Sequence, residues 1–130
     1  MSKWATPNFT FAELRCKGCD GSCSFSQDEE PLFHLEEDAL WKLQEMRKLI
    51  GKPFSPNSAC RCPLHNARVG GAPRSQHRCT KDDPSTAIDI PLFVSKQTIV
   101  EAAEEVGFMG IGTSYKTFVH VDNRPRKARW

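Results

Sequence analysis

The sequence predicts an α+β fold, a small antiparallel sheet with flanking helices, and three observations support this prediction. Two segments, residues 32–50 and 95–106, have apolar residues at helical spacing. They alternate with short apolar segments that suit strands, and glycines or prolines separate these segments. The last two strands are close enough along the chain to form a hairpin. Because 130 residues can bury one core, we expect a single domain over residues 1–130.

Two helices are expected in the first half of the chain. The spacing of Thr10 and Glu13 is that of a capping box, which predicts a short helix that begins there and continues into Cys16. From Leu32 to Ile50 the apolar residues recur on one face, opposite a charged face. Gly51 is expected to end this second helix.

One more helix and four strands are expected after residue 51. Ser95 is the predicted N-cap of a helix that continues to Val106, and Gly107 is expected to close it. Connections through Ser114 and Tyr115 would join the last two strands. The four predicted strands are Phe54–Cys60, Thr86–Leu92, Gly110–Gly112 and Thr117–Val121.

The overall composition is that of a soluble globular protein, with 38% hydrophobic and 26% charged residues. A formal charge of +2 is too small to indicate a nucleic-acid partner. The chain has no apolar run near the roughly 20 residues that cross a bilayer, so no membrane association is expected. Its first residues lack the apolar stretch of a signal peptide, which predicts synthesis in the cytoplasm.

Three residues near predicted strands are candidate ligands of a metal ion: His77, Asp89 and His120. Asp89 stands in the apolar run Ala-Ile-Asp-Ile, where a buried carboxylate needs a partner. Two histidines and one carboxylate would suffice for a catalytic zinc site and leave the fourth position open. Alternatively, Asp89 caps a backbone group and both histidines are ordinary surface or core residues.

Asp122 is the candidate for proton transfer. Side chains alternate along a strand, so His120 and Asp122 are expected on the same face of the segment Phe118–Asp122. A carboxylate beside the metal could act as the general base of amide hydrolysis. It could equally accept the second ring N–H of His120 and support the ligand instead.

Four motifs, in this order, together resemble the M15 zinc peptidases: Ser58–Asn66, Val69–His77, Ala87–Ile90 and Phe118–Asp122. The resemblance is greatest to the D-alanyl-D-alanine carboxypeptidase and murein endopeptidase branch, and it runs from about Phe9 to Trp130. The family includes phage endolysins and shares its fold with the hedgehog signalling domain. The resemblance therefore implies a hedgehog or D,D-peptidase type of fold.

The resemblance also implies roles for single residues. It makes His77, Asp89 and His120 the ligands of one catalytic zinc ion. Arg61 matches an arginine that faces the substrate carbonyl, where a guanidinium can stabilise the developing oxyanion. Ser75 matches a serine that could bind substrate.

The sequence departs from the family pattern at two places. Several relatives have an acidic base three residues before the last histidine, where this chain has Thr117, so Asp122 is the nearest acidic substitute. Residues 78–85 also form a longer polar loop between the first ligand and Asp89.

The chain has six cysteines, which is many for a cytosolic protein of this size. Either they form a second, structural metal site, or they form two or three disulfides in a protein that works outside the cytosol. The six are Cys16, Cys19, Cys23, Cys60, Cys62 and Cys79.

The expected function is hydrolysis of peptide bonds in bacterial peptidoglycan by a zinc metallopeptidase, as an endopeptidase or endolysin that acts on stem peptides. The alternatives are a D,D-carboxypeptidase that removes terminal D-Ala, and a non-catalytic, zinc-stabilised wall-binding or phage tail module. We expect a monomer that acts at the cell wall, reached by phage lysis or by export. The basic segment Arg124–Trp130 could attract anionic wall polymers or be an ordinary solvated C-terminus.

Overall fold

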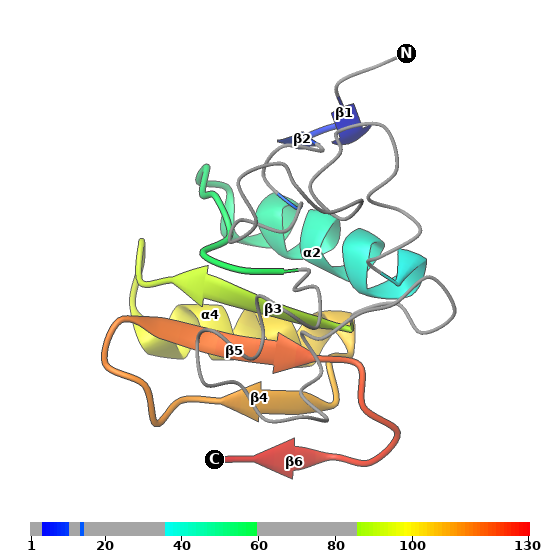
Figure 1. Cartoon of the computed structure of the whole chain (residues 1–130). Helices are drawn as coiled ribbons and strands as arrows, with labels where there is room; N and C mark the ends of the chain where they lie inside the picture. Colours follow the sequence, from blue (N-terminus) through cyan, green and yellow to red (C-terminus); the bar gives the residue numbers. More distant parts are fainter. Residues whose placement is uncertain (1–3, 11–13, 15–35, 60–85) are drawn as a thin grey trace, which may run out of the picture.

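A four-stranded sheet with two helices against one face makes up most of the structure (Figure 1). The computed structural model describes residues 4–10, 14, 36–59 and 86–130. In chain order, its elements are β1 (Trp4–Thr6), β2 (Phe9–Thr10), α2 (Glu37–Ile50), β3 (Ala87–Pro91), α4 (Lys96–Val106), β4 (Gly110–Gly112), β5 (Phe118–Asp122) and β6 (Ala128–Arg129). This arrangement confirms the predicted α+β class.

The sheet is mixed, whereas the sequence predicted an antiparallel sheet. Its strand order is β3-β5-β4-β6, in which β5 pairs antiparallel with β3 and β4 and β6 pairs parallel with β4. Residues 123–127 carry the chain from β5 past β4 to the far edge (Figure 1). This connection reverses the chain, so β6 runs in the same direction as β4. β6 has two residues, too few to show as a strand in the sequence pattern.

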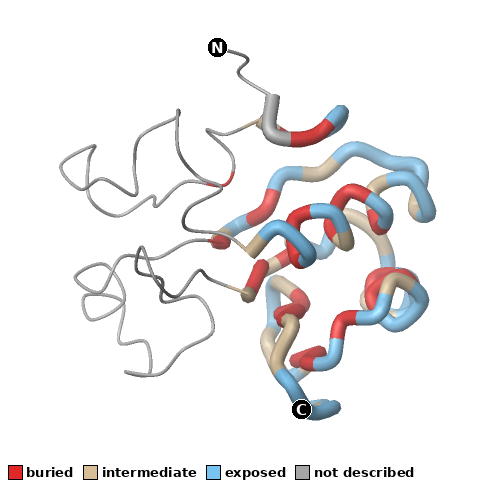
Figure 2. The backbone as a smooth tube through the Cα atoms, turned by 90° about the vertical axis from the view of Figure 1, so that its right-hand side faces the viewer, coloured by how far each residue is buried: buried red, intermediate tan, exposed pale blue. Residues whose placement is uncertain are grey.

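One face of the sheet forms the core with the two helices. The buried residues of β3, β5 and β4 on this face are Ile88, Ile90, Val119, Val121 and Ile111. They belong to one apolar cluster with Leu40, Leu43 and Met46 of α2 and Ile99 and Ala103 of α4. Burial along the described chain is shown in Figure 2; β4 and the stretch from Val119 to Asp122 in β5 are buried on both faces of the sheet. The face away from the core carries the polar residues Asp89, His120 and Asp122.

Helix α2 confirms the described part of the predicted 32–50 helix, and residues 32–35 lie outside the described ranges. Gly51 ends the helix in the left-handed conformation with φ of 74°, and its N–H bonds to the carbonyl of Arg47. The start of α2 is bonded to the residue that follows β5, because the side-chain amide of Asn123 donates to the carboxylates of Glu36 and Asp38. No helix among the described residues is long and apolar enough to cross a membrane.

Helix α4 has the predicted bounds and both predicted caps. The Ser95 hydroxyl accepts a hydrogen bond from the N–H of Thr98 at 3.2 Å, and Gly107 adopts the left-handed conformation with φ of 94°. Ser95→Ala leaves this N–H to solvent, so we expect a loss of about 1 kcal/mol in the free energy of unfolding. Urea denaturation measures this change. A loss below about 0.3 kcal/mol would contradict a stabilising cap.

Two expectations for the first half of the chain differ from the structure. Residues 54–59, the described part of the predicted strand Phe54–Cys60, form no strand, and Ser58 is joined to Asp89 by an isolated bridge. Thr10, the predicted cap of a first helix, instead pairs with Trp4 in a small hairpin. Leu14 is helical and buried, and the other residues after Thr10 up to residue 35 lie outside the described ranges.

Candidate metal centre

Asp89 and His120, two of the three predicted ligands, lie directly opposite each other in neighbouring strands. They are Cα partners in the β3–β5 ladder, so both side chains leave the sheet on the face away from the core. Asp89 Oδ1 is 3.1 Å from His120 Nδ1. The side chains are only 14% and 10% exposed. The fold thus brings together two polar groups that are 31 residues apart.

The pair is suited to hold a metal ion. Two donors bound at 2.0–2.2 Å in a tetrahedral zinc site are about 3.3 Å apart, close to the separation seen here. Carboxylate oxygen and imidazole nitrogen are both usual zinc ligands. The described residues contain no set of three His, Cys, Asp or Glu side chains placed to hold a metal. A complete site would therefore need a ligand from elsewhere in the chain.

The second ring nitrogen of His120 is bonded to Asp122, two residues further along β5. His120 Nε2 is 2.7 Å from Asp122 Oδ2, and the Asp122 carboxylate is fully buried. Because both ring nitrogens face carboxylates, the doubly protonated imidazolium can donate to both. A metal ion on Nδ1 would replace one of these protons and leave the Nε2–H bond to Asp122 in place. Such a carboxylate behind a ligating histidine is frequent in metal sites.

Arg124 is the main counter-charge of Asp122. Its Nε is 2.8 Å from Oδ1 and its Nη2 is 2.7 Å from Oδ2, and its backbone N–H also donates to Oδ1. Burial opposes the ionised carboxyl, but the bonds from Arg124 and His120 outweigh it and hold the pKa of Asp122 well below its usual range. The ionised form of Asp122 is therefore favoured, and both of its oxygens are bonded.

The pKa of His120 is raised above its ordinary value. Burial favours the neutral ring and lowers this pKa, but the hydrogen bonds and negative charges of Asp122 and Asp89 outweigh burial. Without a metal, His120 is thus stabilised in the protonated form. A metal ion and a proton would compete for Nδ1 of His120, so binding of the metal would release that proton.

Glycines on β4 make room for this arrangement. Gly110 and Gly112 are the Cα partners of Asp122 and His120 in the β4–β5 ladder. A Cβ on Gly110 would lie 2.6 Å from Arg124 Nε and would also clash with Asp122. A Cβ on Gly112 would lie 2.6 Å from the indole of Trp130. Larger residues at either position would displace the groups around His120.

The backbone of Asp89 is held from both sides. β5 pairs with it on one edge, and on the other its N–H donates to Ser58 O at 2.8 Å while its carbonyl accepts from Asn57 N at 2.8 Å. Ser58 begins the sequence motif that contains Arg61. The bridge thus joins the start of that motif to a predicted ligand.

The other predicted site residues lie outside the described ranges. These are the third ligand His77, the substrate-contacting candidates Arg61 and Ser75, and all six cysteines, Cys16, Cys19, Cys23, Cys60, Cys62 and Cys79. Their predicted roles stay predictions.

Comparison with known families decides the class of protein. The family model of peptidase M15 matches residues 7–122, which is most of the chain. The chain belongs to the M15 peptidase family. A search of curated proteins finds no match. The matched span of the M15 model includes Asp89, His120 and Asp122, and ends before Arg124 and Trp130.

The M15 motifs did not point to Arg124, Trp130 or the two β4 glycines as parts of the site. One signal for Arg124 was available, because it continues the alternation of His120 and Asp122 by two more residues. The contribution of Trp130 depends on the position of β6 beside β4, which carries no local signal.

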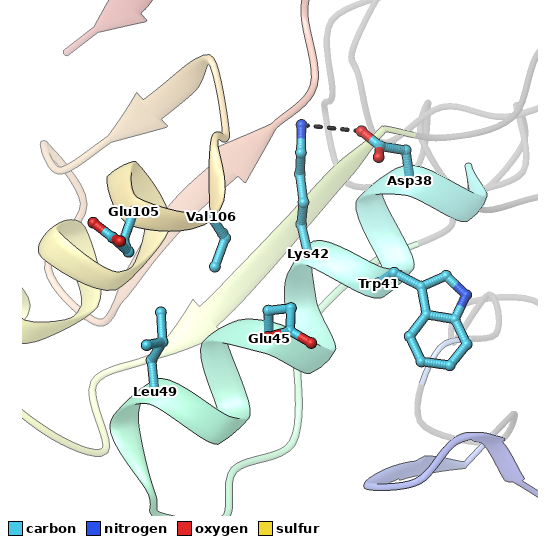
Figure 3. Close-up of a pocket in the computed structure, with 7 residues that line it drawn as sticks. All are labelled: Asp38, Trp41, Lys42, Glu45, Leu49, Glu105 and Val106. Carbon is cyan, nitrogen blue, oxygen red and sulfur yellow. Dashed lines mark ion pairs between the residues drawn. The ribbon is translucent and has the colours of Figure 1, made fainter.

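A groove of about 440 Å³ lies elsewhere on this M15 domain, between α2 and α4 (Figure 3). Leu49 and Val106 line its apolar side, and Lys42 forms an ion pair with Asp38 at 3.0 Å. Neither Asp89 nor His120 is among the described residues that line this groove. In the part of the chain that the structure describes, the Asp89–His120 pair and the groove are thus separate.

Proposed function

We propose that this M15 peptidase is a zinc enzyme that hydrolyses peptide bonds in bacterial peptidoglycan. Its ligands are His77, Asp89 and His120, and its substrates are stem peptides or their crosslinks. The observation that carries this proposal is the register of β3 and β5, which brings Asp89 Oδ1 and His120 Nδ1 to 3.1 Å in a chain that matches the M15 model. The sheet with two helices on one face supports a hedgehog or D,D-peptidase type of fold.

Zinc, when bound, supplies a Lewis acid that polarises the scissile carbonyl and activates water. The chain contributes the placement of the donors. Asp89 is held through its backbone by β5 and Ser58, and His120 is held through its Nε2–H bond to Asp122. Arg61 stabilises the developing oxyanion, and Ser75 binds substrate.

Of the two roles considered for Asp122, its surroundings favour the supporting one. A general base must reach the water or amine with which it exchanges a proton. Asp122 is fully buried, and His120 and Arg124 bond both of its oxygens. We therefore propose that Asp122 orients His120 and keeps Nε2 protonated.

Digestion of purified peptidoglycan tests the activity. The protein is incubated with sacculi as prepared, after chelation, and after zinc is restored, and the soluble fragments are identified by mass spectrometry. We expect cleavage that the chelator abolishes and zinc restores, because the proposed reaction needs the metal.

The fragments also identify the bond. New termini inside the stem peptide or crosslink indicate an endopeptidase, whereas released D-Ala alone indicates a D,D-carboxypeptidase. If no wall type yields fragments although the protein binds zinc tightly, the peptidase proposal is wrong, and the result supports a non-catalytic, zinc-stabilised wall-binding or phage tail module.

A further inference from the structure

The contacts around His120 continue past Asp122 and return to His120 through Trp130. Arg124 holds Asp122 with two hydrogen bonds, and the Arg124 guanidinium lies 4.6 Å from the ring of Trp130. The indole of Trp130 in turn lies against His120, with ring centroids 5.2 Å apart. These four side chains therefore form a closed ring of contacts.

The indole is held in this position by the sheet. The backbone N–H of Trp130 donates to Ile111 O at 3.2 Å, and its backbone carbonyl accepts from Thr113 N at 2.5 Å. These bonds continue the pairing of β6 with β4. The indole N–H donates to the Tyr115 hydroxyl at 3.0 Å. Gly112, the strand partner of His120, leaves the space that the indole fills. Trp130 thus takes the place beside His120 that a β4 side chain would otherwise occupy.

The hairpin that carries Tyr115 is itself anchored. Lys96, at the start of α4, donates from Nζ to the carbonyls of Thr113 and Tyr115 at 2.9 and 3.0 Å. The ring of Tyr115 stacks on Phe118 with centroids 4.4 Å apart. The indole therefore rests on a fixed support.

We propose that Arg124 and Trp130 are positioning residues of the metal centre, through which the β6 segment, residues 124–130, holds the His120 ring toward Asp89. This inference rests on the proposed zinc function and adds residues that lie beyond the span of the family match. Without Arg124 the buried carboxylate of Asp122 loses its bidentate partner. Without the indole, one side of Arg124 and of His120 becomes open to water.

The physical reason is the burial of Asp122 and His120, which are 0% and 8% exposed, whereas Arg124 and Trp130 around them stay partly exposed. A hydrogen bond or ion pair is stronger where water is excluded, and partners behind a metal ligand typically change metal affinity by about 10–100-fold. The planar guanidinium of Arg124 can donate two parallel hydrogen bonds to a carboxylate and can also stack on an aromatic ring. Lysine has the same charge, but its ammonium group can neither donate two parallel hydrogen bonds to one carboxylate nor stack on the indole.

Zinc affinity of variants, measured by chelator competition, tests the proposal in the full chain. We expect Trp130→Ala and Arg124→Lys each to weaken zinc binding by about 10-fold or more. Trp130→Phe keeps an aromatic face and is expected to restore most of the affinity. The control is Arg126→Ala, which removes a guanidinium from an exposed position of the same segment and should leave the affinity unchanged.

The absorption spectrum of the cobalt-substituted protein is the second measurement, because it reports ligand geometry independently of cleavage. A changed spectrum in Trp130→Ala and a wild-type spectrum in Arg126→Ala would support the proposal. Wild-type zinc affinity and spectrum in both Trp130→Ala and Arg124→Lys would overturn it, even if thermal stability fell. If Trp130→Ala does not fold, Arg124→Lys decides: weakened zinc binding supports the proposal, and wild-type affinity and spectrum overturn it.

The wild-type protein separates this inference from the proposed function. A wild type that binds zinc but cleaves no peptidoglycan overturns the peptidase proposal alone, and the affinities of the variants still test Arg124 and Trp130. A wild type that binds neither zinc nor cobalt overturns both.

Discussion

His120→Ala is expected to abolish zinc binding and peptidoglycan cleavage together. The substitution removes the donor atom Nδ1 and also leaves the buried Asp122 without its imidazole partner. The loss should exceed the about 10–100-fold that removal of a neighbour behind a ligand costs, because a ligand itself is lost. Metal content after dialysis and release of fragments from sacculi measure the two effects.

Thr117→Ala is the matched control for His120→Ala. Thr117 is exposed and directly precedes β5. Its backbone carbonyl accepts from Leu92 N, and alanine keeps this bond. We expect near wild-type zinc content and cleavage. Zinc-dependent cleavage that survives in His120→Ala would refute the assignment of His120 as a ligand.

Asp122→Asn is expected to weaken zinc binding by about 10–100-fold. Asparagine keeps the shape of the side chain, but it removes the negative charge that accepts from His120 Nε2 and from Arg124. Competition with a chromogenic chelator measures the affinity. A different outcome would follow if Asp122 were the general base, because kcat would then fall while zinc affinity stayed the same.

The stability of Asp122→Ala provides an independent check. Loss of one partner of a buried ion pair commonly costs about 3–5 kcal/mol, since the other charge is left uncompensated. We expect about 3 kcal/mol here, the low end, because Arg124 is 30% exposed and can be hydrated. Asp38→Ala removes a carboxylate that is 67% exposed and paired with Lys42, so it should cost less than about 1 kcal/mol. Similar losses in both variants would contradict the proposed buried network.

Local patterns predicted the elements that depend on neighbouring residues. The spacing of apolar residues predicted α2 and α4, and the Ser95 and Gly107 caps predicted the ends of α4. Alternation in Phe118–Asp122 placed His120 and Asp122 on the same face, as found. These predictions succeed because hydrogen bonding and side-chain direction within a helix or strand repeat over a few residues.

Weaker local signals explain the errors. β6 and the β1–β2 hairpin consist of strands of two or three residues, in which no alternation can be recognised. The strand predicted from Phe54 rested on a short segment that follows Pro53, and among its described residues the bridge to β3 is at Ser58. Short segments become strands only where a partner edge is present, and the sequence does not say where an edge will be.

The sequence by itself determined the α+β class, the helices α2 and α4, and the family to which the motifs belong. The tertiary structure decided that Asp89 stands opposite His120, that β6 lies parallel to β4, and that Trp130 closes over Gly112 beside His120. The reason is that the pairing of distant strands depends on how the whole chain packs its core, whereas a helix or a cap depends on residues within one turn.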